Sequence, residues 1–164
     1  FDVEQISAEE LTDVSVSSTK IRYALNVGNV ALAKSDLGYP YMVSGKVVSG
    51  KQLGRTIGYP TANIQVAEDY KLIPAIGVYV VGVTVKGDDY YGMLSVGTNP
   101  TVGGTEKTVE VYIFDFNDTI YDEEITVRFL TKIRDEEHFG SIDLLIEALK
   151  NDEVFSRNFL INID

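Results

Sequence analysis

The pattern of apolar and polar residues changes twice along the chain. Up to about residue 40 it is helical. Ser7 and Glu10 have the spacing of a capping box, and the segment SSTKIRYALNVG begins with hydroxyls that can cap a helix and ends at Gly28. A second short helix is predicted from Asn29, whose side chain can cap it, to Gly38.

From Tyr41 to about Lys132, β-branched and aromatic residues alternate with polar ones, and Gly, Pro, Asn and Asp interrupt them. The pattern predicts a tight hairpin turn at Gly87–Asp89. Strands are predicted at Tyr41–Val48, Thr61–Val66, Gly77–Lys86, Tyr90–Val96, Thr108–Phe116 and Glu124–Lys132. Antiparallel strands of this length, without helices between them, favour a small closed barrel over an open sheet with two bare edges.

The last part of the chain returns to a helical pattern. Ser141 can cap the segment IDLLIEALK, and the segment EVFSRNFLINI can continue the helix. Its predicted apolar stripe consists of Leu144, Leu145, Ala148 and Leu149. The expected fold is therefore mainly β: a six-stranded antiparallel barrel with a C-terminal helix and a short helical N-terminal segment.

Composition narrows the class of protein. The chain has 164 residues and is 45% hydrophobic, which is enough for one domain with an ordinary core. It has no cysteine, which excludes disulfides and thiolate metal sites and fits a reducing compartment, so we expect a cytoplasmic protein. We expect no membrane partner, because no apolar run approaches the roughly 20 residues that a membrane span needs. The chain does not begin with Met, so we expect a fragment of a longer protein.

Charge limits the possible ligands. The net charge of −11 repels a nucleic-acid backbone, so we expect no nucleic-acid partner. A small anion could still bind where cations gather, and the segment SGKVVSGKQLGRTIGYPTANI, from Ser44 to Ile64, is the place that offers this. The candidate phosphate-binding residues in it are Gly45, Lys46, Gly50, Lys51, Gly54, Arg55 and Gly58. Glycines allow close approach of the backbone to a ligand, but the glycine spacing alone favours a loose connection between strands with solvated lysines.

The segment YPTAN supplies oxygen ligands next to these glycines. Pro60 fixes the entry into a strand, and Thr61 and Asn63 project from the same face of it. A hydroxyl and a carboxamide suit Mg²⁺ that is already held by ATP oxygens. The alternative is the polar outer face of an ordinary strand.

These motifs resemble a known family. The segment GKVVSGKQLGRTIGYPTANI is similar to the signature of the riboflavin kinase domain of bacterial bifunctional riboflavin kinase/FAD synthetases. Further segments resemble that family in the same order: Pro74–Val83, Ser95–Gly104, Val109–Phe116, Tyr121–Leu130 and Ile133–Leu149. The resemblance implies a six-stranded Greek-key barrel followed by a helix. It also implies transfer of the ATP γ-phosphoryl group to the ribityl 5′-hydroxyl of riboflavin, giving FMN and ADP, with Mg²⁺.

The N-terminal segment resembles a different module. Val16–Arg22, VSSTKIR, is similar to the motif that closes the nucleotidyltransferase module of these enzymes. The histidine motif that begins such a module is absent, since the only histidine is His138. We therefore interpret residues 1–36 as the residual end of an adenylyltransferase module that would convert FMN to FAD, and residues 37–164 as the riboflavin kinase domain.

The resemblance also assigns roles at the site. In TVEVYIFDF, the strand period places Val109, Val111 and Ile113 on one face and Glu110, Tyr112, Phe114 and Phe116 on the other. The family's catalytic Glu corresponds to Glu110, and the aromatic face could hold the flavin ring. Tyr112 stands where we expect His in many relatives. The predicted flavin contacts are Tyr112, Phe114, Arg134 and Asn99, although a simple Gly/Asn/Pro turn explains Asn99 and Thr101 equally well.

Two other functions remain open from the sequence. A non-catalytic flavin-binding barrel would need the aromatic face but not the segment GRTIGYPTAN. An oligomerisation or regulatory domain would use these loops only to connect strands.

Overall fold

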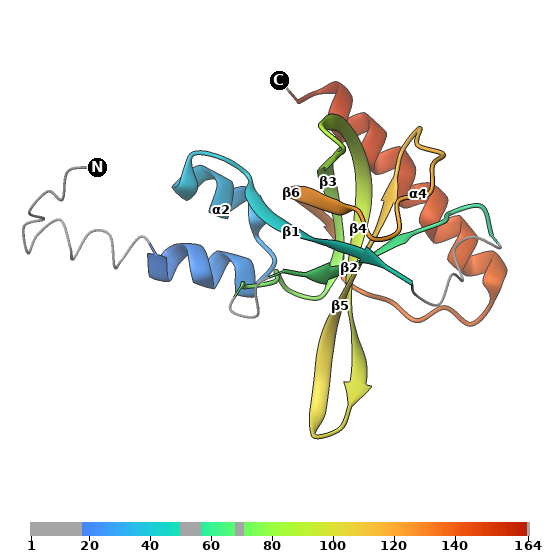
Figure 1. Cartoon of the computed structure of the whole chain (residues 1–164), viewed down its shortest axis with the longest axis horizontal. Helices are drawn as coiled ribbons and strands as arrows, with labels where there is room; N and C mark the ends of the chain where they lie inside the picture. The colour runs from blue at the N-terminus through green and yellow to red at the C-terminus, as the bar shows by residue number, and fades with distance from the viewer. Residues whose placement is uncertain (1–17, 50–56, 68–70, 164) are drawn as a thin grey trace, which may run out of the picture.

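The computed structural model describes residues 18–49, 57–67 and 71–163. Their main body is a closed antiparallel barrel with the strand order β1-β2-β5-β4-β3-β6 (Figure 1). The strands are β1 (Tyr41–Val48), β2 (Ala62–Val66), β3 (Gly77–Val85), β4 (Asp88–Thr101), β5 (Gly104–Ile113) and β6 (Glu124–Arg134). Strands β3, β4 and β5 follow one another as hairpins, and β6 returns to lie beside β3, which is a Greek key. The predicted barrel is confirmed.

The β3–β4 turn lies one residue earlier than predicted. Val85 pairs with Asp88, and the turn residues are Lys86 and Gly87, with φ of 52° and 83°. A type I′ hairpin turn requires positive φ at both central positions, and its twist matches that of the strands. Asp88 and Asp89 therefore already belong to β4.

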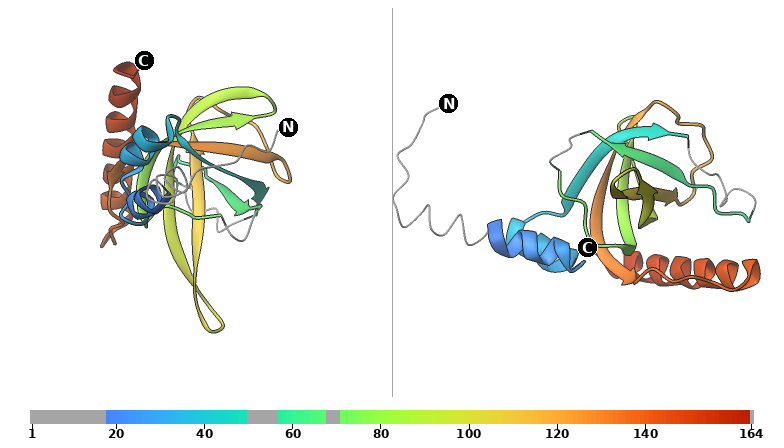
Figure 2. Two further views of the ribbon diagram at one scale, coloured as in Figure 1. Left: turned by 90° about the vertical axis from the view of Figure 1, so that its left-hand side faces the viewer. Right: turned by 90° about the horizontal axis from the view of Figure 1, so that it is seen from below.

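The β4–β5 hairpin is longer than the sequence indicates. The segment expected to be a Gly/Asn/Pro loop continues both strands, with Gly97 paired to Thr108 and Thr101 to Gly104. Beyond Val96 this hairpin pairs only with itself, since the β3–β4 pairing ends at Gly77 and Val96. It projects from the barrel as a separate arm (Figures 1 and 2).

The barrel interior is filled by alternate residues of the strands. One connected cluster of buried side chains contains Val43 and Val47 of β1, Ile64 of β2 and Phe129 of β6. The predicted inner face of β5 is confirmed, because Val109, Val111 and Ile113 belong to the same cluster. The opposite face of β5 is therefore directed away from the barrel interior.

Two short helices pack against this barrel core. Residues 18–26 are helical, and α2 (Val30–Leu37) follows with the predicted caps: Asn29 Oδ1 accepts from Leu32 N at 3.1 Å, and Gly38 has φ of 85°. Their inward side chains, Ala24, Leu25, Val30 and Ala33, are buried in the same cluster as Tyr79 and Phe129. Residues 16 and 17 of the VSSTKIR motif lie outside the described residues.

The C-terminal helix α4 (Ile142–Ile161) lies along the outside of the barrel (Figure 2). Ser141 caps it as predicted, since its Oγ accepts from Leu144 N at 3.2 Å. The predicted apolar stripe is wrong at Leu144, which is 51% exposed. The inner row instead runs through Leu145, Leu149, Asp152 and Ser156, because these spacings of three and four residues lie along one face. Within the described ranges, neither α4 nor the shorter helices have the length and apolarity that a membrane crossing requires.

Candidate active site

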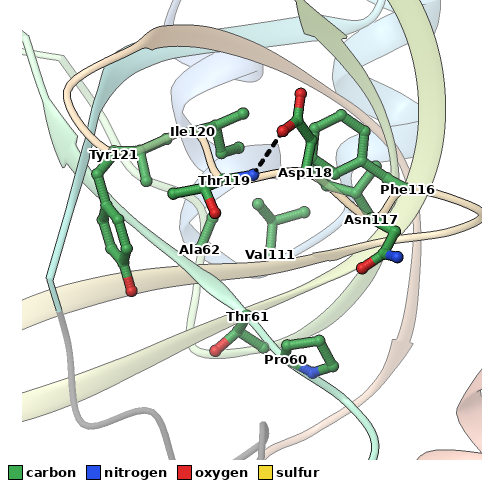
Figure 3. A pocket seen from close by; sticks show the side chains of 12 residues that line it. Pro60, Thr61, Ala62, Val111, Phe116, Asn117, Asp118, Thr119, Ile120 and Tyr121 are labelled. Atoms are coloured by element: carbon green, nitrogen blue, oxygen red, sulfur yellow. Dashed lines mark hydrogen bonds between the residues drawn. The ribbon is translucent and has the colours of Figure 1, made fainter.

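Two cavities open on either side of the start of β2. The first, here called the loop cavity, has a volume of about 430 Å³ and lies between the barrel and the segment 116–121 (Figure 3). The second, here called the helix cavity, has a volume of about 230 Å³ and lies between the barrel and α4. Thr61 lines both cavities, so they meet at this residue.

The loop cavity is lined by inward-facing barrel residues and by the polar connection between β5 and β6. Its lining residues are Val47, Pro60, Thr61, Ala62, Val111, Ile113, Phe116, Asn117, Asp118, Thr119, Ile120 and Tyr121. Asp118 Oδ1 accepts from Thr119 N at 2.9 Å, which holds this connection in a turn (Figure 3). Residues 117–121 were not identified from the sequence as part of a site, although the polar run Asn117–Thr119 directly after a strand was a visible signal.

The helix cavity combines aromatic, apolar and charged side chains. Its lining residues are Ile57, Tyr59, Thr61, Val78, Met93, Leu94, Ser95, Glu110, Tyr112, Arg134, Glu136, Glu137, Phe139, Leu145, Leu149 and Asp152. Three predicted site residues of the outer strand faces, Thr61, Glu110 and Tyr112, therefore come together here.

Strand register places Glu110 at this cavity. It is half-buried on the outer face of β5, opposite Asn63 of β2 and Ser95 of β4. Asn63 lies beside it in the pairing but is not among the lining residues of either cavity. A carboxylate, a hydroxyl and a carboxamide thus occupy neighbouring positions on adjacent strands.

An aromatic cluster supports this part of the site. Tyr112 contacts Tyr59 and Phe114 edge to face, with ring centroids 5.1 and 5.7 Å apart. Tyr59, Phe114 and Met93 are buried together, so Phe114 lies beneath the cavity lining rather than in it. Burial raises the pKa of Tyr112, and burial together with the hydrogen bond from Tyr59 Oη to Glu153 Oε1 raises the pKa of Tyr59 to about 12.

Phe116 does not share the face of Glu110, contrary to the prediction. β5 ends at Ile113, and Asp115 adopts a φ of 57° in the turn that follows. The change of direction sends Phe116 to the loop cavity, where its ring lies 5.0 Å from that of Tyr90. The aromatic face beside Glu110 is correspondingly smaller than the strand period indicated.

Arg134 lines the helix cavity, and its guanidinium is bound by Asp152 of α4. Nε and Nη2 each donate to the carboxylate at 2.9 Å, and Nη1 donates to the carbonyl of Asp135 at 3.1 Å. Asp152 is 3% exposed and is one of the two buried polar residues in the described part of the chain. Sequence reasoning missed Asp152, although it continues the row of Leu145 and Leu149 on α4 and is the one charged residue in that row.

The glycine-rich stretch is only partly described. Gly50, Lys51, Gly54 and Arg55 lie outside the described residues. Gly58 has a φ of 89°, and neither it nor Gly45 or Lys46 lines either cavity. Gly45 is a buried strand residue at which a Cβ would lie 2.3 Å from the backbone oxygen of Gln65. Close approach of two strands therefore accounts for this glycine without a phosphate.

Two further predicted contacts stand apart from the cavities. Lys46 is exposed on the outer face of β1, opposite Gln65 and Glu124. Asn99 is exposed on the projecting hairpin opposite Glu106, and the structure does not bring it to either cavity. Within the described ranges, no three His, Cys, Asp or Glu residues form a cluster that could hold a metal ion by themselves.

A family model and the curated relatives of this chain indicate the same family. A family model described as riboflavin kinase matches residues 37–160. The chain is 41% identical to a bifunctional riboflavin kinase/FMN adenylyltransferase of Listeria monocytogenes over 165 residues, covering 100% of this chain and 52% of that protein. It is 42% identical to the Escherichia coli protein of the same description, covering 89% of this chain and 46% of that protein. The chain thus spans about half the length of the curated relatives it matches.

Solved structures share the fold. A crystal structure described as a macrolide-efflux protein from Streptococcus pneumoniae has a TM-score of 0.84 at 42% identity, covering 96% of this chain and 57% of that one. A riboflavin kinase from Trypanosoma brucei has a TM-score of 0.53 at 29% identity, covering 75% of this chain and 78% of that one.

Proposed function

This chain belongs to the riboflavin kinase family, and from that premise we propose that it transfers the γ-phosphoryl group of ATP to the 5′-hydroxyl of the ribityl chain of riboflavin. The products are FMN and ADP. The observation that carries the proposal is the pair of cavities that meet at Thr61, with Glu110 beside the junction. Transfer between two substrates requires two sites that open onto one reacting position.

The two cavities suit different substrates. The helix cavity takes the flavin ring, because Tyr59, Tyr112 and Phe139 offer aromatic surfaces and α4 adds leucine side chains. The loop cavity takes the nucleotide, because it is larger and its polar wall offers amide, hydroxyl and carboxylate groups of residues 117–119. The ribityl chain and the γ-phosphate then meet near Thr61.

Glu110 acts as the general base. Its carboxylate accepts the proton of the 5′-hydroxyl while that oxygen attacks the γ-phosphorus and the bond to the bridging oxygen of ADP breaks. The proton remains on the carboxylate and the electron pair leaves with ADP, so the step is balanced. The pairing of Glu110 with Asn63 and Ser95 on the neighbouring strands fixes the backbone from which this carboxylate projects.

Mg²⁺ fits the oxygen ligands at the start of β2. Thr61 and Asn63 supply a hydroxyl and a carboxamide oxygen, and Mg²⁺ commonly uses one or two protein ligands beside phosphate and water oxygens. When bound, the ion neutralises charge on the ATP phosphates. The backbone of the stretch from Gly50 to Gly58, with Lys51 and Arg55, would position the same phosphates.

The setting of the enzyme follows from its substrates and relatives. A kinase that consumes ATP works where ATP is maintained, so we place it in the cytoplasm. The curated relatives are about twice as long and are described as bifunctional. We propose that the whole protein carries an adenylyltransferase module that converts FMN to FAD, of which residues 1–36 are the end.

A direct assay tests this function. The chain is incubated with riboflavin, ATP and Mg²⁺, and the flavins are separated by chromatography. We expect FMN to appear in proportion to time and protein, and to require both ATP and the metal. Riboflavin that binds but is recovered unchanged would contradict the kinase proposal and indicate a flavin-binding barrel without catalysis.

A further inference from the structure

The charged side chains of the helix cavity are distributed unevenly. Glu110, Glu136, Glu137 and Asp152 line it, and Arg134 is the one cation among the described lining residues. Glu136 and Glu137 are exposed at the entrance, whereas Glu110 is half-buried on the strand behind them. The described lining residues are therefore negative overall, and Arg134 is the one among them that reduces this negative charge.

Asp152 neutralises this one cation. It receives two hydrogen bonds of 2.9 Å from the guanidinium while itself only 3% exposed, and α4 fixes its backbone. The remaining Nη1 donates to the carbonyl of Asp135, and the guanidinium lies 5.5 Å from the Phe139 ring centroid. A bidentate pair of this geometry fixes the orientation of both side chains. The pair has no net charge, and the three glutamates are left without compensation from the described residues.

We propose that Asp152 is a specificity-determining residue: by compensating Arg134 it makes the helix cavity more acidic by one unit of charge and so strengthens the preference of the cavity for uncharged riboflavin over its phosphorylated product. This inference rests on the proposed function. Riboflavin is a neutral alcohol, whereas FMN carries a phosphate of about −1.5 to −2 charge at neutral pH, as other phosphate monoesters do. The same flavin ring thus binds in both cases, and the carboxylates repel only the product.

The size of the effect follows from distance and screening. A cavity of about 230 Å³ is comparable in width with the Debye length of about 8 Å at physiological ionic strength, so charges on its wall still act on a bound phosphate. One unit of charge changed at such a separation alters the affinity for FMN by about three- to tenfold at an intermediate effective dielectric. The affinity for riboflavin does not change in this way, because riboflavin carries no phosphate.

The test is the ratio of two dissociation constants, that of FMN divided by that of riboflavin. Both are measured by calorimetric titration of the whole chain without nucleotide or Mg²⁺. In Asp152→Asn the guanidinium loses its compensating charge, and we expect the ratio to fall about three- to tenfold. In the double variant Arg134→Gln/Asp152→Asn both charges are absent, as both cancel in the wild type, and we expect the ratio to return to within about twofold of the wild-type value.

A merely structural role of the pair predicts a different result. Loosening of α4 would weaken both flavins in proportion, so an unchanged ratio in Asp152→Asn overturns the proposal. If that variant does not fold, the double variant Glu136→Gln/Glu137→Gln decides, since both residues are exposed: we expect a lower ratio, and an unchanged one overturns the proposal. Glu106→Gln, which is exposed on the projecting hairpin, is the matched control and leaves the ratio as it is.

The wild type gives a final check. Binding of FMN more tightly than riboflavin under these conditions would overturn the inference while leaving FMN formation intact. A chain that binds neither flavin would overturn both the inference and the assignment of the helix cavity. Failure of the proposed function itself appears separately, as absence of FMN in the assay with ATP.

Discussion

The position of Glu110 depends on the register of three strands. Its neighbours Val109 and Val111 are buried in the barrel core, while Glu110 faces the helix cavity. A shift of one residue would exchange these faces and bury the carboxylate among valines. The sequence alternation already determines which face it occupies, because a buried run of valines on the other face leaves one register for β5.

Replacing Glu110 by Gln keeps the shape of the side chain but removes the proposed base. General-base catalysis contributes about 10²- to 10⁴-fold, so we expect kcat to fall within that range while the affinity for riboflavin changes much less. The measurement pairs steady-state kinetics with a flavin titration on the same variant. Glu106→Gln, on the same strand but away from both cavities, should retain wild-type turnover. Turnover of Glu110→Gln within a few-fold of wild type would require a different base.

Thr61 and Asn63 should govern productive binding of the metal–nucleotide complex. Thr61→Ala and Asn63→Ala each remove one of the proposed oxygen ligands, and we expect activity to require more Mg²⁺ and ATP for saturation. The measurement is kcat/KM for ATP over a range of Mg²⁺ concentrations. Gln65→Ala is the matched control, because Gln65 is exposed on the same strand and lines neither cavity. Wild-type dependence on Mg²⁺ in both variants would argue against this metal site.

Tyr59 should contribute to stability in a way that depends on pH. Burial first, and then the hydrogen bond to Glu153, raise its pKa from the usual 10.0 to about 12. The folded state therefore keeps the proton to higher pH than the unfolded state, so this contribution is complete below pH 10 and is lost as pH rises toward 12. Tyr59→Phe should cost about 1 kcal/mol at neutral pH and reduce the loss of stability between pH 10 and 12.

Urea unfolding at several pH values measures this effect. Part of the alkaline loss should persist in Tyr59→Phe, because burial raises the pKa of Tyr79 to about 12 as well. Tyr39→Phe, at an exposed position, is the control. An alkaline profile of Tyr59→Phe that coincides with the wild type would show that the Tyr59 hydroxyl is not coupled to folding.

At the scale of elements, the pairing of β1 with β2 depends on Gly45. A Cβ there would lie 2.3 Å from the Gln65 oxygen and 2.6 Å from Ile64 Cγ2. The backbone of Gln65 belongs to a paired strand and moves only at a cost in stability. We therefore expect Gly45→Ala to destabilise the fold by about 1–3 kcal/mol, as overpacking does elsewhere. Chemical denaturation measures it, and Gly104→Ala, with no atom within 4 Å of the added Cβ, is the control. Unchanged stability with a raised KM for ATP would instead indicate a phosphate-binding glycine.

Most elements could be predicted because their signals are local. The bounds of β1 follow from alternation, and the two caps of α2 follow from Asn29 and Gly38. The sequence predicted the wrong local structure where the residue types fit more than one conformation. Asn99 and its Gly and Pro neighbours have the composition of a turn but lie in a paired hairpin. Asp115 has a positive φ that redirects Phe116, and because it is not a glycine the sequence does not indicate this conformation.

At the scale of the whole molecule, the chemical groups of the site were predictable but its two cavities were not. Glu110 and Thr61 are visible in the sequence as polar residues on strands. Their meeting requires β2 beside β5, the segment 116–121 on one side and α4 on the other. Asp152 was missed for the same reason, since its significance depends on its direct contact with Arg134 of β6, which is distant in sequence.

The chain should make FMN but not FAD. The nucleotidyltransferase motif that the sequence carries is Val16–Arg22, and the single histidine, His138, comes after the barrel strands rather than in a motif that begins such a module. We expect FMN and ATP to be recovered unchanged after incubation with the chain and Mg²⁺, with flavins followed by chromatography. A contaminant-free preparation that yields FAD would show that the N-terminal segment does more than the residual end of a module can.

The position of β6 in the barrel also has a consequence for how the protein is made. β6 pairs with both β1 and β3, so the barrel cannot close until residues 124–134 are available. On the ribosome, β1 can therefore pair with β2 first, whereas its second partner, β6, is synthesised much later. Such non-local pairing slows folding. The nascent chain accordingly has neither a finished barrel nor a complete helix cavity until β6 and α4 have been synthesised, and a chain released before that point should have no partial activity.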